Sequence, residues 1–295
     1  MSIYSLLDNN LLYARLSKIR KRKRRVSPSF FFDYIFLYFE YMHKRATPKV
    51  SLFCYNYKIM TVLTEPNPGK ALAIEVQGST YERYPIKTPV INESDDFVQI
   101  VIDEAGDFLQ DGDVLLLAES VVAISQGRGF KFSDIKYGWF AEFYSKFVTR
   151  TPSGIGLGTP ETMQLAINEC GLLRISLAVA IAGMTRPLGW KGNFYRVAGS
   201  KARAIDGPTA GTMPPYNEFA SLSPKNPRGY AQDAEQRITQ DVEVIIVDAN
   251  DIGVNILGTR DKTQEKLGVE LCLDNPMGQG SEGTPALICR KIQNS

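Results

Sequence analysis

Polar and apolar positions alternate or cluster along the chain in patterns that predict a succession of strands and helices from residue 71 onward. Strands are expected where aliphatic and β-branched residues alternate or form short runs, which occurs at 71–77, 193–198, 241–253 and 284–292. The run at 114–125 predicts a buried strand followed by a short helical turn, and residues 97–103 fit a helix or a strand. Helices are expected at 160–170 and 230–238, with a further apolar element at 173–184. Because strands and helices mix without strict βαβ alternation, we expect an α+β fold.

One predicted helix has well-defined ends. Thr159 is a suitable N-cap, Pro160 suits the first helical position, Glu161 suits the positive end of the helix dipole, and Gly171 ends the helix. The glycine-rich turn SGIGLGTP that leads into it is either an ordinary capped turn or an anion site at the helix N-terminus. It matches neither the dinucleotide fingerprint nor the P-loop.

The first 59 residues differ in composition from the rest of the chain. They hold 12 Lys/Arg against 3 Asp/Glu, a net charge of +9, whereas the remainder holds 22 against 29, a net charge of −7. The basic cluster KIRKRKRR suits phosphates, but the aromatic run at 30–42 is too short and too interrupted by acids to span a bilayer. The segment is a translated upstream region without a stable fold, a targeting or membrane-surface segment, or a functional arm. With an acidic body, we expect no nucleic acid and no membrane partner.

Cysteine and histidine usage excludes several kinds of site. Cys54, Cys170, Cys272 and Cys289 are far apart and form no CxxC pair, so we expect reduced thiols in a cytoplasmic protein. The one histidine, His43, lies in the basic N-terminal segment. A Ser-His-Asp or Cys-His hydrolase is therefore not expected.

Carboxylates at two places suggest a cation site. Asp206 stands in a loop of turn-forming residues, directly before Gly207 and Pro208. Asp248 and Asp251 follow the buried strand VIIV, and ligand sites gather at the C-terminal ends of such strands. Carboxylate oxygens suit Mg²⁺ or Mn²⁺ if the two places meet in space, although a solvated turn is the alternative for the second. The spacing does not complete an EF-hand loop.

The order of several segments resembles the coenzyme F-420 γ-glutamyl ligase family, which attaches glutamate to a deazaflavin precursor at the expense of GTP. The resemblance covers roughly residues 70 to 292. Its segments are SDDFVQIVIDEAGDFLQDGDVLLLAESVVAISQGR, AIDGP, LSPKNP, VEVIIVDANDIG and NPMGQGSEGTPALICR.

The resemblance implies a γ-glutamyl ligase-like domain over residues 65–295 that forms a homodimer. It implies Mg²⁺ or Mn²⁺ held by Asp206, Asp248 and Asp251, with GTP as co-substrate and glutamate or a similar acid and amine as the other substrates. The implied nucleotide contacts are Lys87, Ser120, Arg128 and Thr209. In this chemistry a carboxylate is phosphorylated and an amine then attacks the acyl phosphate.

The chain departs from the family pattern at several of these positions. Ala123-Ile124 stands where the family has Ser-Lys, and Gln126 where it has an acid. Ala249 replaces a threonine, and Thr209 stands where an asparagine is expected. The stretch between Phe130 and Asn193 looks inserted. These departures leave open a second interpretation, a non-catalytic relative that binds a nucleotide or an anionic metabolite.

Overall fold

The computed structural model describes residues 61–148, 156–190, 192–250, 253–278, 280 and 282–292. By contacts between residues the chain divides at Met60, and all described residues belong to the unit Met60–Ser295. The predictions for residues 1–59, and the predicted metal ligand Asp251, lie outside the described residues. The proposed start of the domain at residue 65 stays a prediction.

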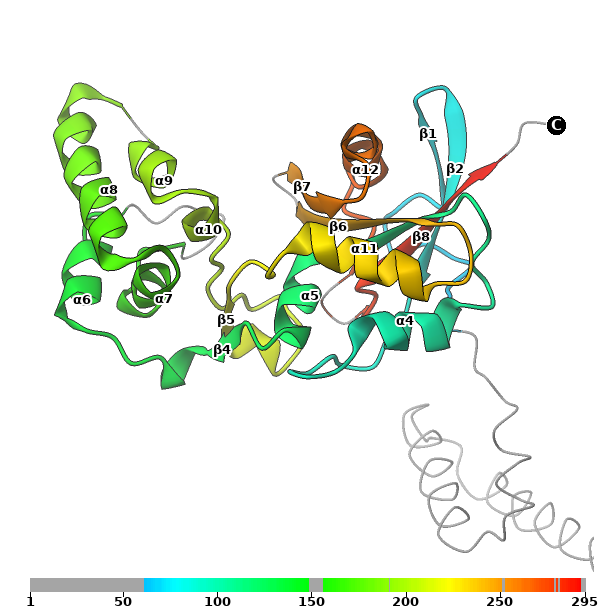
Figure 1. Ribbon diagram of the computed structural model, residues 1–295, viewed down its shortest axis with the longest axis horizontal. Coiled ribbons are helices and arrows are strands. Elements are labelled where there is room, and N and C mark those ends of the chain that lie inside the picture. Colours follow the sequence, from blue (N-terminus) through cyan, green and yellow to red (C-terminus); the bar gives the residue numbers. More distant parts are fainter. Residues whose placement is uncertain are drawn as a thin grey trace, which may run out of the picture. The chain divides into compact units, whose positions relative to one another are not determined.

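A six-stranded mixed sheet forms the centre of this unit (Figure 1). In spatial order its strands are β1 (Ala73–Val76), β2 (Ser79–Ile86), β8 (Ala286–Ile292), β3 (Val114–Ala118), β6 (Glu243–Asn250) and β7 (Gly253–Thr259). β3 and β6 are parallel, and every other neighbouring pair is antiparallel. Together with the helices around it, this mixed sheet confirms the predicted α+β fold.

Helices cover both faces of the sheet, because its central strands are apolar on both sides. Along β3, Leu115 and Leu117 face one core and Leu116 faces the other. The helices that contribute to these cores include α4 (Phe97–Ala105), α11 (Pro227–Arg237) and α12 (Glu265–Leu271). Full burial of each leucine is worth about 1.5–3 kcal/mol. The strand is therefore held from both sides, and its C-terminal end is a stable place for polar side chains.

A separate hydrophobic core lies in what we call the helical region, residues 132–203 (Figure 1). Its helices are η1 (Phe132–Asp134), α6 (Trp139–Ser145), α7 (Pro160–Cys170), α8 (Leu172–Thr185), η2 (Arg186–Leu188), α9 (Asn193–Ala198) and α10 (Ser200–Arg203). The remaining elements are α5 (Glu119–Ser125), η3 (Tyr216–Glu218), η4 (Lys262–Gln264) and a two-stranded sheet of β4 (Gly129–Lys131) and β5 (Phe219–Ser221). The core formed by α7, α8 and α9 also includes Ala220 of β5. The helical region is thus joined to the small sheet next to it.

Most predicted elements are present, with one change of type. The Thr159 side chain accepts a hydrogen bond from the Thr162 backbone N–H, which confirms the predicted cap. The alternative of an anion site there stays a prediction. The predicted strand at 193–198 is wrong, because α9 occupies it and buries Phe194 and Ala198, four residues apart, in one core.

None of the helices among the described residues combines the length and apolar character needed to cross a bilayer.

Candidate functional site

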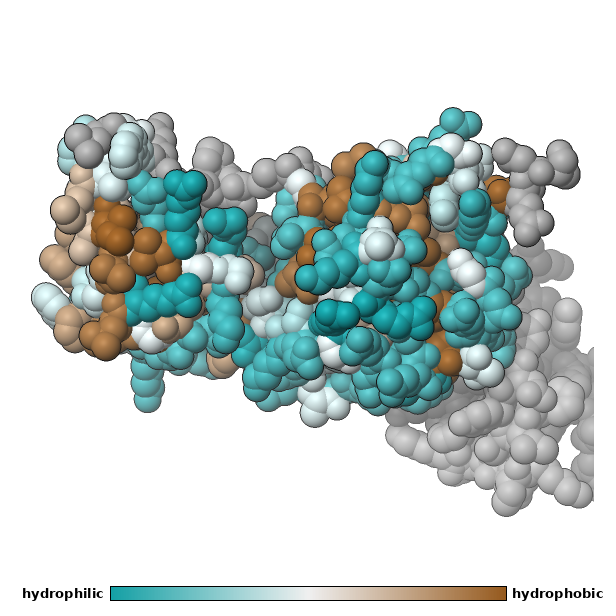
Figure 2. All heavy atoms as spheres, turned by 45° about the horizontal axis from the view of Figure 1, so that its top comes forward, coloured by the Kyte–Doolittle hydropathy of each residue, from teal (hydrophilic) through white to brown (hydrophobic). Residues whose placement is uncertain are grey.

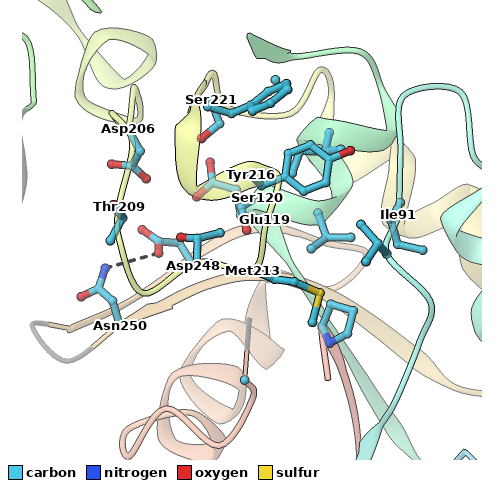
Figure 3. A pocket seen from close by; sticks show the side chains of 18 of the residues that line it. Ile91, Glu119, Ser120, Asp206, Thr209, Met213, Tyr216, Ser221, Asp248 and Asn250 are labelled. Carbon is cyan, nitrogen blue, oxygen red and sulfur yellow. Dashed lines mark hydrogen bonds between the residues drawn. The ribbon is translucent and has the colours of Figure 1, made fainter. Parts of the chain in front are cut away.

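A pocket of about 690 Å³ lies at the C-terminal ends of β3 and β6 (Figure 3). In the parallel pairing of these strands, Ala118 lies opposite Val247. The next residues are Glu119, which begins α5, and Asp248, which lies near the end of β6. They therefore stand side by side at the same edge of the sheet, and both line the pocket. This is the place in an open sheet where ligands usually bind.

Asp206 reaches the same pocket from the loop that follows the helical region. Its backbone N–H donates to the Ser221 carbonyl at 3.0 Å, and the Ser221 N–H donates to the Asp206 carbonyl at 2.9 Å. This bridge attaches the loop to the end of β5, and Gly207 and Pro208 turn the chain away immediately afterwards. Figure 3 shows Asp206, Asp248 and Glu119 around one space, although they are far apart in the sequence.

The three carboxyl groups disfavour one another's negative charge. Burial, and then the charge of Asp248, raise the pKa of Glu119 to about 8, against a hydrogen bond from Ser223 that lowers it. Burial raises the pKa of Asp206, and Asp248 raises it further. Burial also raises the pKa of Asp248, which a hydrogen bond from Asn250 at 3.4 Å opposes. A positive charge that enters the pocket is expected to reduce the repulsion between the three carboxylates and to lower their pKa values.

One carboxylate oxygen of Glu119, Oε1, is buried without a hydrogen-bond donor in the described part of the chain. An unsatisfied buried carboxylate oxygen costs free energy, so a bound cation or a donated N–H would stabilise it. Among the described residues that line the pocket there is no Lys, Arg or His to supply that charge.

The carboxylate oxygens of the pocket suit a divalent cation whose remaining ligands come from waters and from a bound substrate. The described residues contain no group of three or more His, Cys, Asp or Glu side chains arranged to hold a metal ion. Mg²⁺, however, is commonly bound through one or two carboxylates, with waters and substrate phosphates as the other ligands. Asp206 and Asp248 fit such a two-carboxylate site, and Glu119 adds a third acceptor close to it.

The predicted nucleotide contacts divide into two pairs. Ser120 and Thr209 line the pocket beside the carboxylates. Lys87 is exposed and does not line it, although its neighbour Thr88 does. Arg128 is not a lining residue either.

Arg128 is occupied elsewhere. Its side chain is only 8% exposed and forms an ion pair with Glu169 of α7 at 3.1 Å. Its Nε donates to the Ser223 carbonyl, and the Ser223 side chain is in turn hydrogen-bonded to Glu119. Arg128 thus connects the helical region to the wall of the pocket.

The opposite side of the pocket is apolar. Ile91, Ile124, Met213, Tyr216 and Phe219 line it, and the last two rings meet edge to face with centroids 5.0 Å apart. Ile124 occupies a position where the family resemblance predicts a lysine. The pocket therefore offers charge on one side and a surface for a ring or an alkyl chain on the other.

Glu119 was not predicted as a site residue. The signal was present, because Glu119 is the first residue after the buried run VLLLA, as Asp248 is the first after VIIV. A rule that takes the first polar residue after each buried apolar run as a candidate ligand predicts both Glu119 and Asp248.

No curated protein matches the chain. The sequence profile of the F420-0:Gamma-glutamyl ligase family matches residues 85–258, more than half of the chain. The matched residues include strands β3, β6 and most of β7, the loop of Asp206, and all three pocket carboxylates. The order of motifs and the family match agree, and the chain belongs to the F420-0:gamma-glutamyl ligase family.

Proposed function

We propose that this protein is a ligase that forms an amide bond between an acid and an amine, using GTP and Mg²⁺ or Mn²⁺. Three carboxylates and no described basic side chain line its pocket, and this observation carries the proposal. A triphosphate would be repelled by such a pocket unless a divalent cation entered with it. Family membership supports amide-bond formation, and the pocket supports the need for the metal.

The chain's own residues would hold the substrates as follows. Asp206 and Asp248 would hold the cation, which neutralises phosphate charge when it is bound. The hydroxyl groups of Ser120 and Thr209 line the pocket, where they can donate to phosphate oxygens. The apolar side, with Tyr216 and Phe219, suits the ring of a substrate.

The reaction has two steps. The acid's carboxylate oxygen attacks the γ-phosphorus, and the bond to the departing nucleoside diphosphate breaks. The amine nitrogen then attacks the acyl carbon, so that a C–N bond forms, the C–O bond to phosphate breaks and the nitrogen loses a proton. Glu119 would accept that proton after a bound cation has displaced its own, because the charge of the cation opposes the burial and the neighbouring Asp248 charge that raise the pKa of Glu119 to about 8.

Calorimetry with GTP and Mn²⁺ tests the proposal. We expect the full chain to bind GTP only with the metal, and Asp206→Asn or Asp248→Asn to weaken binding at least about tenfold, since each removes a charged ligand. Asp241→Asn is a matched control, because Asp241 is exposed and does not line the pocket. The metal site is contradicted if GTP binds equally well with and without the metal. It is also contradicted if Asp241→Asn weakens GTP binding as much as the pocket variants do.

A second candidate function is binding without ligation. Ile124 lines the pocket where a lysine is expected, and Arg128 is held by Glu169, so neither supplies a positive charge to phosphate. Metal-dependent GTP binding without phosphate release, with glutamate and a panel of other acids and amines present, favours this candidate. Phosphate release that depends on an acid and is lost in Asp248→Asn favours the ligase.

The proposed location is the cytoplasm. Cys170, Cys272 and Cys289 are free thiols, and the last two are buried in one core. Reduced cysteines are typical of that compartment, which also supplies GTP.

A further inference from the structure

The pocket carries more negative charge than its described residues and one metal ion can balance. When ionised, the carboxylates of Glu119, Asp206 and Asp248 give a charge of −3, and no Lys, Arg or His is among the described residues that line the pocket. A divalent cation at the two aspartates leaves one negative charge, that of Glu119. The phosphates of a bound nucleotide make the pocket more negative still. A positively charged group on a substrate would supply what the described side chains do not.

Glu119 is the carboxylate best placed to bind that group. Its carboxyl group is hydrogen-bonded to the Ser223 side chain, but its Oε1 accepts no hydrogen bond from the described residues. The torsion about the last bond of a glutamate is broad, so this oxygen can turn to face the pocket. Figure 3 shows Glu119 between the two aspartates and Tyr216. A group bound to Glu119 therefore lies between the proposed metal site and the apolar side of the pocket.

The apolar side of the pocket begins one turn further along the same helix. Ser120 and Ile124 are four residues apart in α5, so they share a face of the helix, and both line the pocket. Ile124 stands where the family resemblance predicts a lysine, and Tyr216 and Phe219 line the pocket with it. A carboxylate or phosphate placed against these side chains would lose its water without gaining a partner. An uncharged carbon skeleton fits there instead.

These features disfavour an amino acid as the amine substrate. The α-carboxylate of an amino acid is joined to the same carbon as its ammonium group, so it would lie beside Glu119 and the nucleotide phosphates. Like charges repel strongly in a pocket with little water. Arg128 does not offset this charge, because it does not line the pocket and is paired with Glu169 at 3.1 Å. An amine without a carboxylate avoids the repulsion and keeps the attraction.

We propose that the amine substrate is a primary amine without a carboxylate, bound as an ammonium ion at Glu119 with its alkyl or aromatic skeleton against Ile124 and Tyr216. This assignment rests on the proposed function, because it identifies the amine of that ligation. It differs from the substrates that the family resemblance implies, in which glutamate supplies the amine. Glu119 then determines specificity through its charge, and Ile124 through its lack of charge.

Calorimetry of the full chain, with a chelator and without nucleotide, tests this assignment. The probes are 2-phenylethylamine, 2-phenylethanol and phenylalanine, which share a ring and differ in charge. At about pH 8.5 a primary amine is still protonated, and Glu119 is mostly ionised because its pKa is about 8. We expect 2-phenylethylamine to bind at least about tenfold more tightly than either of the other probes, since it alone gains a charge-assisted hydrogen bond without adding a negative charge.

Two variants separate the effect of charge from that of shape. Glu119→Gln should weaken 2-phenylethylamine at least about tenfold and leave 2-phenylethanol unchanged, which also shows that the pocket is intact. Glu75→Gln is the matched control, because Glu75 is exposed on β1 and does not line the pocket. Ile124→Lys should weaken 2-phenylethylamine and strengthen phenylalanine, because the added lysine repels ammonium and pairs with a carboxylate. Circular dichroism identifies a variant that misfolds, and the comparison of the three probes on the native chain needs no variant.

The assignment is overturned if the native chain does not bind 2-phenylethylamine, or binds 2-phenylethanol or phenylalanine equally well. It is also overturned if Asp206→Asn weakens 2-phenylethylamine more than Glu119→Gln does, since the ammonium would then lie at the proposed metal site. GTP and Mn²⁺ are absent from these measurements. A chain that prefers 2-phenylethylamine but fails to bind GTP with Mn²⁺ would therefore contradict the proposed function and support the ammonium site, and the reverse result would contradict the ammonium site alone.

Discussion

The sheet and the helical region differ in how completely their apolar surfaces are covered. The sheet is covered on both faces, with one core towards α4 and α11 and another towards α12. The helical region buries a single core between its helices and leaves large apolar side chains exposed on α6 and α8 (Figure 2), among them Trp139 and Leu173. The sheet is therefore complete by itself, whereas the helical region has apolar surface still to bury.

This difference matters because the pocket uses both. Glu119 and Asp248 stand at the ends of strands that are packed on two sides, whereas Asp206 follows the helical region in the chain. Regions with fewer buried contacts open at a lower free energy than the core of a sheet. We therefore expect Asp206 to be the least firmly held of the three carboxylates, and Arg128 with Glu169 to be the connection that holds it.

The largest expected loss of unfolding free energy comes from substitutions that leave a cavity in each hydrophobic core. Leu116→Ala in the sheet and Met163→Ala in the helical region each remove a fully buried side chain and should cost about 2–5 kcal/mol. We expect Leu116→Ala to lower the protection of amides throughout the unit, and Met163→Ala to lower it only between residues 157 and 203. Hydrogen exchange read by mass spectrometry measures both. Equal loss of protection in the two regions for both variants would show that they unfold as one.

A smaller effect is expected at the connection between the regions. Glu169→Gln leaves Arg128 buried without its counter-ion, which should cost about 3 kcal/mol of unfolding free energy. Glu142→Gln is the control, because its pair with Lys146 is exposed and worth about 0.3–0.5 kcal/mol. Denaturant unfolding measures both variants. If Glu169→Gln costs no more than the control, Arg128 is not the connection.

Most of the sheet could be predicted from the sequence, because its strands are apolar runs. The runs ending at Ala118 and at Val247 predict buried strands directly. β2 gives no such signal, since its segment STYERYPI includes Glu82 and Arg83. Arg83 is nevertheless buried and forms an ion pair with Asp274, 191 residues later in the chain. Periodicity reports local burial and cannot anticipate a charge that is buried through a distant partner.

The same limit applies to the pocket. The loop of Asp206 and the strand end at Asp248 were both predicted, but which carboxylates share a space depends on the β3–β6 pairing and on the bridge to Ser221. Neither contact is local in sequence. Arg128 shows the reverse case, in which a motif predicts a ligand contact and the folded chain places the side chain against Glu169.

The smallest of these effects, at the sheet side of the pocket, concerns the pH dependence of stability. The pKa of Glu119 is about 8 in the folded chain against 4.5 for the free group, so between these values the folded state holds a proton that the unfolded state has released. The free energy of unfolding should therefore fall as pH rises from about 4.5 to about 8. Glu119→Gln keeps the shape without the charge, so its pH profile should be shallower, and the variant should be more stable than the native chain at pH 8 by a free energy on the order of a few kcal/mol, since each pKa unit corresponds to about 1.4 kcal/mol.

Thermal unfolding with a chelator present, at a series of pH values, measures this difference. The raised pKa values of Asp206 and Asp248 act in the same direction and should leave a residual slope in the variant. Glu75→Gln on β1 is the control, because Glu75 is exposed and far from the pocket edge, and it should match the native profile. Parallel profiles for the native chain and Glu119→Gln would mean that solvent already satisfies the buried oxygen. In that case the sheet side of the pocket would carry no more electrostatic strain than an ordinary surface turn.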